Sequence, residues 1–205
     1  GLYMSVFPYS HFNTDFAMHS MCTTDIPGEY YVLSGSHIFH LNSEKGILNA
    51  VFFGDKYECW DLYRQKDSYW MTINGGLLRL NKQLQVTGHY KLPLERTAIE
   101  NRFRWIMENT DGSLWISTSR SGIIRFDPLT NNLQRILHDS SFPLNLNGNY
   151  VEQMLTDSHH RIWIATSDGL YRYDQQKKTA TSFNLCDTNQ RTRGCENVKG
   201  LYEHK

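Results

Sequence analysis

The sequence lacks an excess of charge of either sign. Lys and Arg together number 21, Asp and Glu together also number 21, and the formal net charge of the 205 residues is therefore zero. A protein that binds nucleic acid or an anionic membrane surface through its overall charge needs a basic footprint. The charge balance argues against both classes, and we expect no nucleic acid among the partners of this chain.

Long apolar runs are absent as well. The longest contain a handful of residues, such as Ala50-Val51-Phe52-Phe53, whereas a membrane-spanning helix needs about 20. Gly1-Leu2-Tyr3 opens neither the basic nor the apolar region of a secretory signal. We therefore expect either that a signal has been removed or that the chain is an excerpt. Cysteine is scarce, and four residues in 205 do not make a disulfide-rich scaffold.

Short apolar or alternating runs, separated by turn residues, dominate the sequence. Leu114-Trp115-Ile116-Ser117 and Ile162-Trp163-Ile164-Ala165 are examples, and branched and flat side chains of this kind suit a half-buried pleated surface. Asp111-Gly112 lies between two such runs and is typical of a tight hairpin turn. Apolar residues keep helical spacing nowhere without interruption by Gly, Pro or Asn. The pattern predicts an all-β protein, either a sandwich, a barrel or a propeller.

An internal repeat decides among these three architectures. Residues 107–127 and 154–174 share an apolar strand, a polar turn, Trp-Ile-small-Thr, a turn with Gly, and a strand that ends in Asp. Residues 67–81 and 29–42 are weaker copies. The aromatic anchors lie 39, 45 and 48 residues apart, and they are Tyr31, Trp70, Trp115 and Trp163. A period of roughly 40 to 50 residues with four short strands is typical of the blade of a β-propeller.

The repeat predicts the position of each blade. We expect four whole blades of four antiparallel strands at 16–54, 55–94, 95–140 and 141–186. The end of a preceding blade is expected at 1–15, and a loop with the first strand of the next blade at 187–205. The innermost strands are expected at 16–22, 59–63, 103–107 and 150–155, and the outermost at 48–53, 86–90, 133–137 and 179–183. A fifth blade made from the two chain ends would lack its second strand and leave an open edge. We therefore expect a segment of a longer, seven-bladed propeller.

Residues 110–118 and 157–174 resemble the two-component regulator propeller repeat, and residues 145–151 resemble the linker that leads into such a blade. The resemblance implies the periplasmic sensor region of a Bacteroides-type hybrid two-component system. It further implies an inner-membrane anchor, a cytoplasmic histidine kinase and a homodimeric parent protein. The partners implied are the remaining blades of the same chain and an oligosaccharide, whose binding switches on glycan-utilisation genes. No cofactor is implied.

Loops that join the second and third strands, and those that join one blade to the next, meet on one face of a propeller. We expect ligand-binding residues there, because Arg forks and Asn amides suit sugar hydroxyls, carboxylates and sulfates, although solvated turn residues are the alternative. The candidates are Asn74, Arg102, Arg120, Asn149 and Asp168. We expect no catalytic residue and no metal site, since no His-Glu-x-x-His, Cys-x-x-Cys or Gly-x-Ser-x-Gly pattern occurs.

The Trp and Cys residues each allow two interpretations. Trp70, Trp115 and Trp163 are expected to pack between blades rather than to stack on sugars. Trp60 and Trp105 lie on predicted innermost strands and can face either a channel or a sheet interface, with a place in the core favoured. In an oxidising periplasm Cys186 and Cys195 can close a small disulfide loop, while Cys22 and Cys59 are expected as buried free thiols. Two other functions stay open. They are a propeller enzyme resembling streptogramin lyase, which uses His and Glu with a metal, and a plain protein-interaction propeller.

Overall fold

The computed structural model describes residues 18–53, 57–91, 103–119, 122–135, 150–167, 169–177, 179–183 and 198–204. These ranges contain sixteen β-strands, each antiparallel to its neighbour in the same sheet. Within these ranges there is no helix that could span a lipid bilayer. The all-β prediction is confirmed.

The strands form four separate four-stranded sheets, each built from four consecutive strands in chain order. We refer to the sheets as blades 1 to 4. Blade 1 contains β1 (Met18–Thr23), β2 (Glu29–Ser34), β3 (His37–Asn42) and β4 (Ile47–Phe53). Blade 2 contains β5 (Cys59–Gln65), β6 (Ser68–Ile73), β7 (Gly76–Leu80) and β8 (Val86–Lys91). Blade 3 contains β9 (Phe103–Glu108), β10 (Leu114–Thr118), β11 (Ile123–Asp127) and β12 (Asn132–Arg135). Blade 4 contains β13 (Val151–Thr156), β14 (Ile162–Thr166), β15 (Gly169–Asp174) and β16 (Thr179–Phe183).

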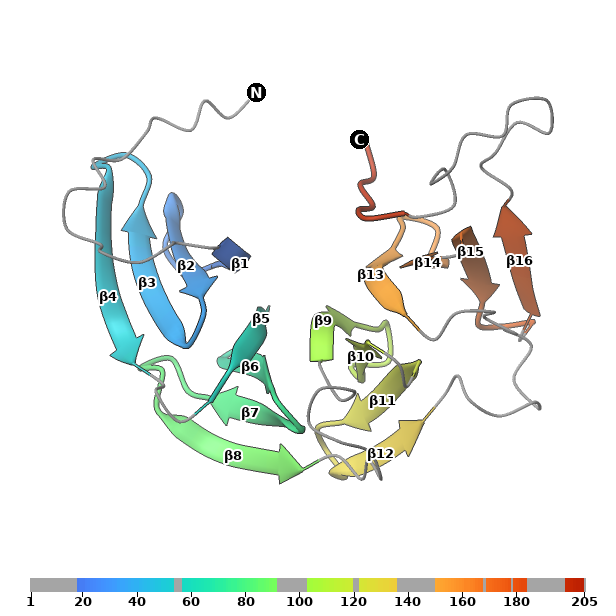
Figure 1. The fold of residues 1–205 in the computed structure, drawn as a ribbon, viewed down its shortest axis with the longest axis horizontal. Coiled ribbons are helices and arrows are strands. Elements are labelled where there is room, and N and C mark those ends of the chain that lie inside the picture. The colour runs from blue at the N-terminus through green and yellow to red at the C-terminus, as the bar shows by residue number, and fades with distance from the viewer. Residues whose placement is uncertain are drawn as a thin grey trace.

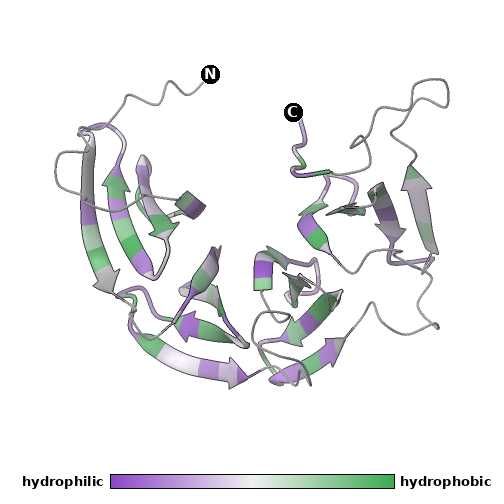
Figure 2. Ribbon diagram, in the orientation of Figure 1, coloured by the Kyte–Doolittle hydropathy of each residue, from purple (hydrophilic) through white to green (hydrophobic). Residues whose placement is uncertain are grey.

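The four blades stand side by side in an arc around a common centre (Figure 1). The first strand of each blade lies innermost, and the fourth lies outermost. Because a blade is a sheet with two apolar faces, it must bury each face against a neighbouring blade. Figure 2 shows hydrophobic stretches on strands of all four blades, interrupted by hydrophilic ones. The second strands of blades 2 and 3 are buried almost continuously, as packing on both faces requires. The predicted propeller architecture is confirmed.

Three apolar clusters fill the spaces between successive blades, and Trp70 and Trp115 each lie within one of them. Trp70 of blade 2 is 1% exposed and packs edge-to-face against Phe126 of blade 3, with ring centroids 5.4 Å apart. Trp115 of blade 3 is equally buried and lies 6.1 Å from the ring of Tyr173 in blade 4. Inter-blade packing is thus confirmed for these two Trp residues. Trp163 differs, since it is half-buried and packs on Phe183 of its own blade, 5.2 Å away.

A buried carboxylate joins the inner strands of three blades. Asp61 on β5 is 4% exposed and accepts a hydrogen bond from the backbone N–H of Ile106 on β9, at 2.7 Å. It also accepts one from Leu62 N at 2.9 Å and one from the hydroxyl of Ser20 on β1. A similar contact occurs at the other end of the arc, where Gln153 Oε1 accepts the N–H of Leu201 at 2.7 Å. Polar side chains of inner strands therefore satisfy backbone donors of the following inner segment.

Asp157 organises the turn between β13 and β14. Its carboxylate accepts hydrogen bonds from the indole Nε1 of Trp163 at 2.7 Å, from Arg161 Nε at 2.6 Å and N at 2.9 Å, and from His159 N at 3.0 Å. Burial alone would raise the pKa of Asp157, but these hydrogen bonds outweigh it and lower the pKa to about 2. The ionised carboxylate therefore stabilises the folded state.

We expect the substitution Asp157→Ala to lower the free energy of unfolding by about 2 kcal/mol at neutral pH, because it leaves several donors without an acceptor. Since the folded pKa is depressed, the contribution of this group is complete above pH 4 and is lost as the pH falls through about 2. Urea denaturation of both proteins at pH 7 and pH 3 measures the difference. An equal difference at the two pH values would contradict this account.

Candidate functional site

Every inner strand carries a β-bulge at the same place. In each pairing of the first and second strands the register skips one residue of the first strand near its beginning. The four skipped residues are chemically diverse, and they are His19, Trp60, Arg104 and Glu152. A bulge re-aims a side chain out of the regular alternation and is over-represented next to active sites. We call these four residues the axial rim, because they lie on the innermost strands around the centre of the arc (Figure 1).

The axial rim lies on the face where sequence analysis placed ligand-binding loops. The bulge in β5 is next to the turn between β6 and β7, which contains Asn74. The indole Nε1 of Trp60 donates to Asn74 Oδ1 at 3.1 Å, and Asn74 Nδ2 donates to Glu58 Oε2 at 2.5 Å. One predicted site residue is thus brought into direct contact with the rim.

Blades 1 and 2 contribute an aromatic half to the rim. The imidazole of His19 lies parallel to the indole of Trp60, with an interplanar angle of 6° and centroids 5.5 Å apart. The Nδ1 atom of His19 is also 3.0 Å from the carbonyl oxygen of Cys59, which fixes the ring. Two flat rings held in this way offer the kind of surface on which the apolar face of a sugar packs.

Blades 3 and 4 contribute a charged half. The guanidinium of Arg104 lies over the ring of Tyr150, 4.9 Å from its centroid, and 3.7 Å from Glu152 Oε2. The ammonium of Lys199 contacts the other oxygen of Glu152. The Glu152 side chain is only 6% exposed, whereas those of Arg104 and Lys199 are 33% and 68% exposed. Two accessible cations therefore share one nearly buried carboxylate.

The other four predicted site residues lie outside the described residues, as do both cysteines of the predicted disulfide. The four are Arg102, Arg120, Asn149 and Asp168, and the cysteines are Cys186 and Cys195. Sequence analysis missed His19, Arg104 and Glu152. The four rim residues lie 12, 10, 11 and 11 positions before the aromatic anchors Tyr31, Trp70, Trp115 and Trp163, so an alignment on the anchors does not bring them to one position. Trp105, the next residue after Arg104, packs against the apolar cluster between blades 3 and 4.

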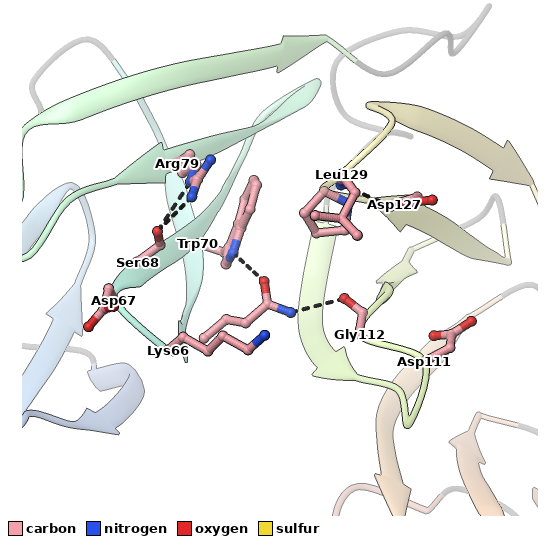
Figure 3. Close-up of a pocket in the computed structure, with 11 residues that line it drawn as sticks. Lys66, Asp67, Ser68, Trp70, Arg79, Asp111, Gly112, Asp127 and Leu129 are labelled. Atoms are coloured by element: carbon pink, nitrogen blue, oxygen red, sulfur yellow. Dashed lines mark hydrogen bonds between the residues drawn. The ribbon is translucent and has the colours of Figure 1, made fainter.

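A cleft of about 340 Å³ lies on the opposite face, between blades 2 and 3 (Figure 3). At its base Gln65 Oε1 accepts a hydrogen bond from Trp70 Nε1 at 3.0 Å, and Gln65 Nε2 donates to Gly112 O at 3.0 Å. On the wall formed by blade 2, Arg79 donates to Ser68 Oγ at 3.1 Å and lies over the Trp70 ring. These polar groups bind one another, which indicates a junction between blades rather than a ligand site.

The described residues contain no group of three or more His, Cys, Asp and Glu side chains placed to hold a metal ion. Cys59 is buried and Cys22 is half-buried, and both are free thiols. Burial raises the pKa of each to about 12, so both thiols are protonated and unreactive at neutral pH.

Two comparisons of the sequence find two-component signalling proteins. Residues 145–168 match the family model described as two component regulator propeller. A stretch of 84 residues is 27% identical to Histidine kinase P4 of Formosa agariphila, and this match covers 41% of the present chain and 6% of the kinase.

Solved structures share the fold. The extracellular domain of a putative hybrid two component system from Bacteroides thetaiotaomicron has a TM-score of 0.67 at 15% identity, over 93% of this chain and 24% of that one. A catalytically inactive virginiamycin B lyase from Staphylococcus aureus, solved with quinupristin, has a TM-score of 0.66 at 17% identity, over 89% and 59% respectively. The chain thus spans less than two thirds of each relative, and at these identities the likeness shows the fold alone.

Proposed function

We propose, from the two component regulator propeller repeat now confirmed at residues 145–168, that this chain is part of the sensor region of a hybrid two-component signalling protein. That repeat is the observation that carries the proposal. The sensor region would lie in the periplasm and belong to a homodimeric protein anchored in the inner membrane. Its signal would be an oligosaccharide, and its output a cytoplasmic histidine kinase that controls glycan-utilisation genes.

Ligand binding would act by shifting an equilibrium between two arrangements of the sensor dimer. An oligosaccharide changes kinase activity only if it binds one arrangement more tightly than the other. The axial rim is the surface on which we place the ligand, since it combines aromatic rings with charged and amide groups. Asn74 contacts the rim, and Arg102, Arg120, Asn149 and Asp168 remain predicted contributors from the surrounding loops.

The first test is the reading frame that encodes the chain. We expect it to continue through further Trp-Ile-x-Thr blades to a membrane helix and a histidine kinase. The second test is autophosphorylation of the full-length protein in membrane vesicles, with and without oligosaccharides drawn from plant, algal and animal glycans. A frame that encodes no kinase, or a kinase that no oligosaccharide changes, would contradict the proposal.

The same experiment separates the two other functions considered from the sequence. Mass spectrometry of the oligosaccharides after incubation detects turnover, which would favour an enzyme. A protein retained by the propeller face in the absence of any saccharide response would favour an interaction scaffold.

A further inference from the structure

We infer that the charged half of the axial rim binds the acidic group of an anionic saccharide, either a carboxylate or a sulfate, and that Arg104 is the residue that binds it. This inference rests on the proposed sensor function and narrows its ligand class. We base it on the contacts of the Arg104 guanidinium and on the charged side chains around it.

The guanidinium of Arg104 contacts Tyr150 and Glu152, but its N–H donors make no hydrogen bond within the described residues. The guanidinium lies over the ring of Tyr150, 4.9 Å from the centroid. The nearest carboxylate oxygen is 3.7 Å away, which is beyond hydrogen-bonding distance. Arg104 donates no hydrogen bond to any residue in the described ranges. A guanidinium carries five N–H donors in a planar fork that matches carboxylates and sulfates.

Two arginines near the opposite face donate hydrogen bonds, whereas Arg172 of blade 4, like Arg104, lies over aromatic rings, 5.9 Å from Trp163 and 5.6 Å from Phe183. Arg79 donates to Ser68 Oγ at 3.1 Å, and Arg125 donates to Asp111 Oδ2 at 2.9 Å. Both lie near the opposite face, where the polar groups of the inter-blade junction satisfy one another. Arg104 is distinguished by its place, since it lies at a bulge of an inner strand and shares Glu152 with Lys199.

The local charge favours an anion. Glu152 is nearly buried and is shared by Arg104 and Lys199, so the three groups together carry a net charge of +1. The two cations are accessible while the carboxylate is not, and an incoming anion therefore meets positive charge first. The adjacent aromatic half, with His19 stacked on Trp60, supplies a flat surface for the apolar face of a sugar ring. The combination favours a sugar that carries the anion over a free inorganic ion.

The test measures binding to the full-length protein by calorimetry, with a panel in which every anionic oligosaccharide has a neutral counterpart. Tetragalacturonate is paired with its methyl ester, and sulfated galactan tetrasaccharides are paired with their desulfated forms. These two pairs distinguish a carboxylate from a sulfate. We expect at least one anionic member to bind, and its neutral counterpart to bind about 10- to 100-fold more weakly.

The substitution Arg104→Gln is expected to cause a similar loss of about 10- to 100-fold for the anionic ligand, with no change for the neutral one. Arg79→Gln is the matched control, because that guanidinium also lies over an aromatic ring but on the opposite face, and we expect it to leave affinity unchanged. Circular dichroism and thermal unfolding of both variants check that the fold is intact.

The outcomes separate the inference from the proposed function. If neutral and anionic members bind equally well, or if Arg104→Gln keeps full affinity for an anionic ligand, the inference is wrong and the sensor function stands. If no member of the panel binds, the inference and the saccharide-sensing function both fail.

Discussion

Replacing Asp61 with Ala lowers the free energy of unfolding by about 3 kcal/mol, because two buried backbone donors lose their acceptor. These donors are the N–H groups of Ile106 and Leu62, which lie on the inner strands of two different blades. Urea denaturation at pH 5 measures the loss. Asp67→Ala is the control, since the Asp67 side chain is 84% exposed and pairs only with the partly exposed Lys82, and exposed pairs of this kind contribute little. Equal effects of the two substitutions would contradict the role assigned to Asp61.

The contribution of Asp61 to the free energy of unfolding falls as the pH rises, whereas the contribution of Asp157 falls as the pH drops. Burial raises the pKa of Asp61 to about 6, and the hydrogen bonds from Ser20, Ile106 and Leu62 only partly offset this rise. The folded state thus keeps a proton that the unfolded state releases near pH 4, so this contribution is complete below pH 4 and is lost as the pH rises through about 6. We expect the wild type to lose stability relative to Asp61→Asn between pH 4.5 and pH 7. A difference that stays constant would show that the carboxyl is ionised throughout.

Replacing Trp70 with Ala lowers the free energy of unfolding by about 4 kcal/mol, the range measured for large aromatic residues in protein cores. Trp70 is almost fully buried between blades 2 and 3, and its indole N–H is bound by Gln65, which in turn contacts Gly112 of blade 3. The substitution therefore removes both a large apolar contact and a polar connection between the blades. Thermal and urea unfolding measure the loss.

Trp163→Ala is the matched comparison, because Trp163 occupies the same position in blade 4. Its side chain is only half-buried and packs within its own blade, so we expect a loss about half as large. A loss from Trp163→Ala that equals the loss from Trp70→Ala would mean that burial between blades is not the source of the effect.

The blade architecture was predictable because its signal is periodic. The anchors Trp70, Trp115 and Trp163 recur 45 and 48 residues apart, within the period of one propeller blade, and strand alternation around them fixes which residues face a neighbouring blade. The innermost strands β5, β9 and β13 accordingly lie within two residues of their predicted ranges. The prediction for Trp163 captured its strand but not its partial burial, since burial depends on what stands beside the sheet.

The axial rim was not predictable in the same way. A bulge changes the pairing of one backbone residue, and the side chains at the four bulges, His19, Trp60, Arg104 and Glu152, share no chemistry that a pattern could detect. The contact between Asn74 and Trp60 likewise depends on the bulge in β5. Of the predicted loop residues, Asn74 contacts this surface, and sequence analysis did not point to the strand residues that form it.

The bulges also separate the residues that pack one blade against the next from the four residues of the axial rim. In β9, Phe103 and Ile106 face the cluster shared with blade 2, while Trp105 and Met107 face the cluster shared with blade 4, and Arg104 is the additional residue between them. A bulged residue thus belongs to neither apolar cluster, and it can change without altering the volume of either one. On the proposed sensor function, we expect single substitutions at these four positions to change ligand preference, while the packing that closes one blade against the next stays as it is.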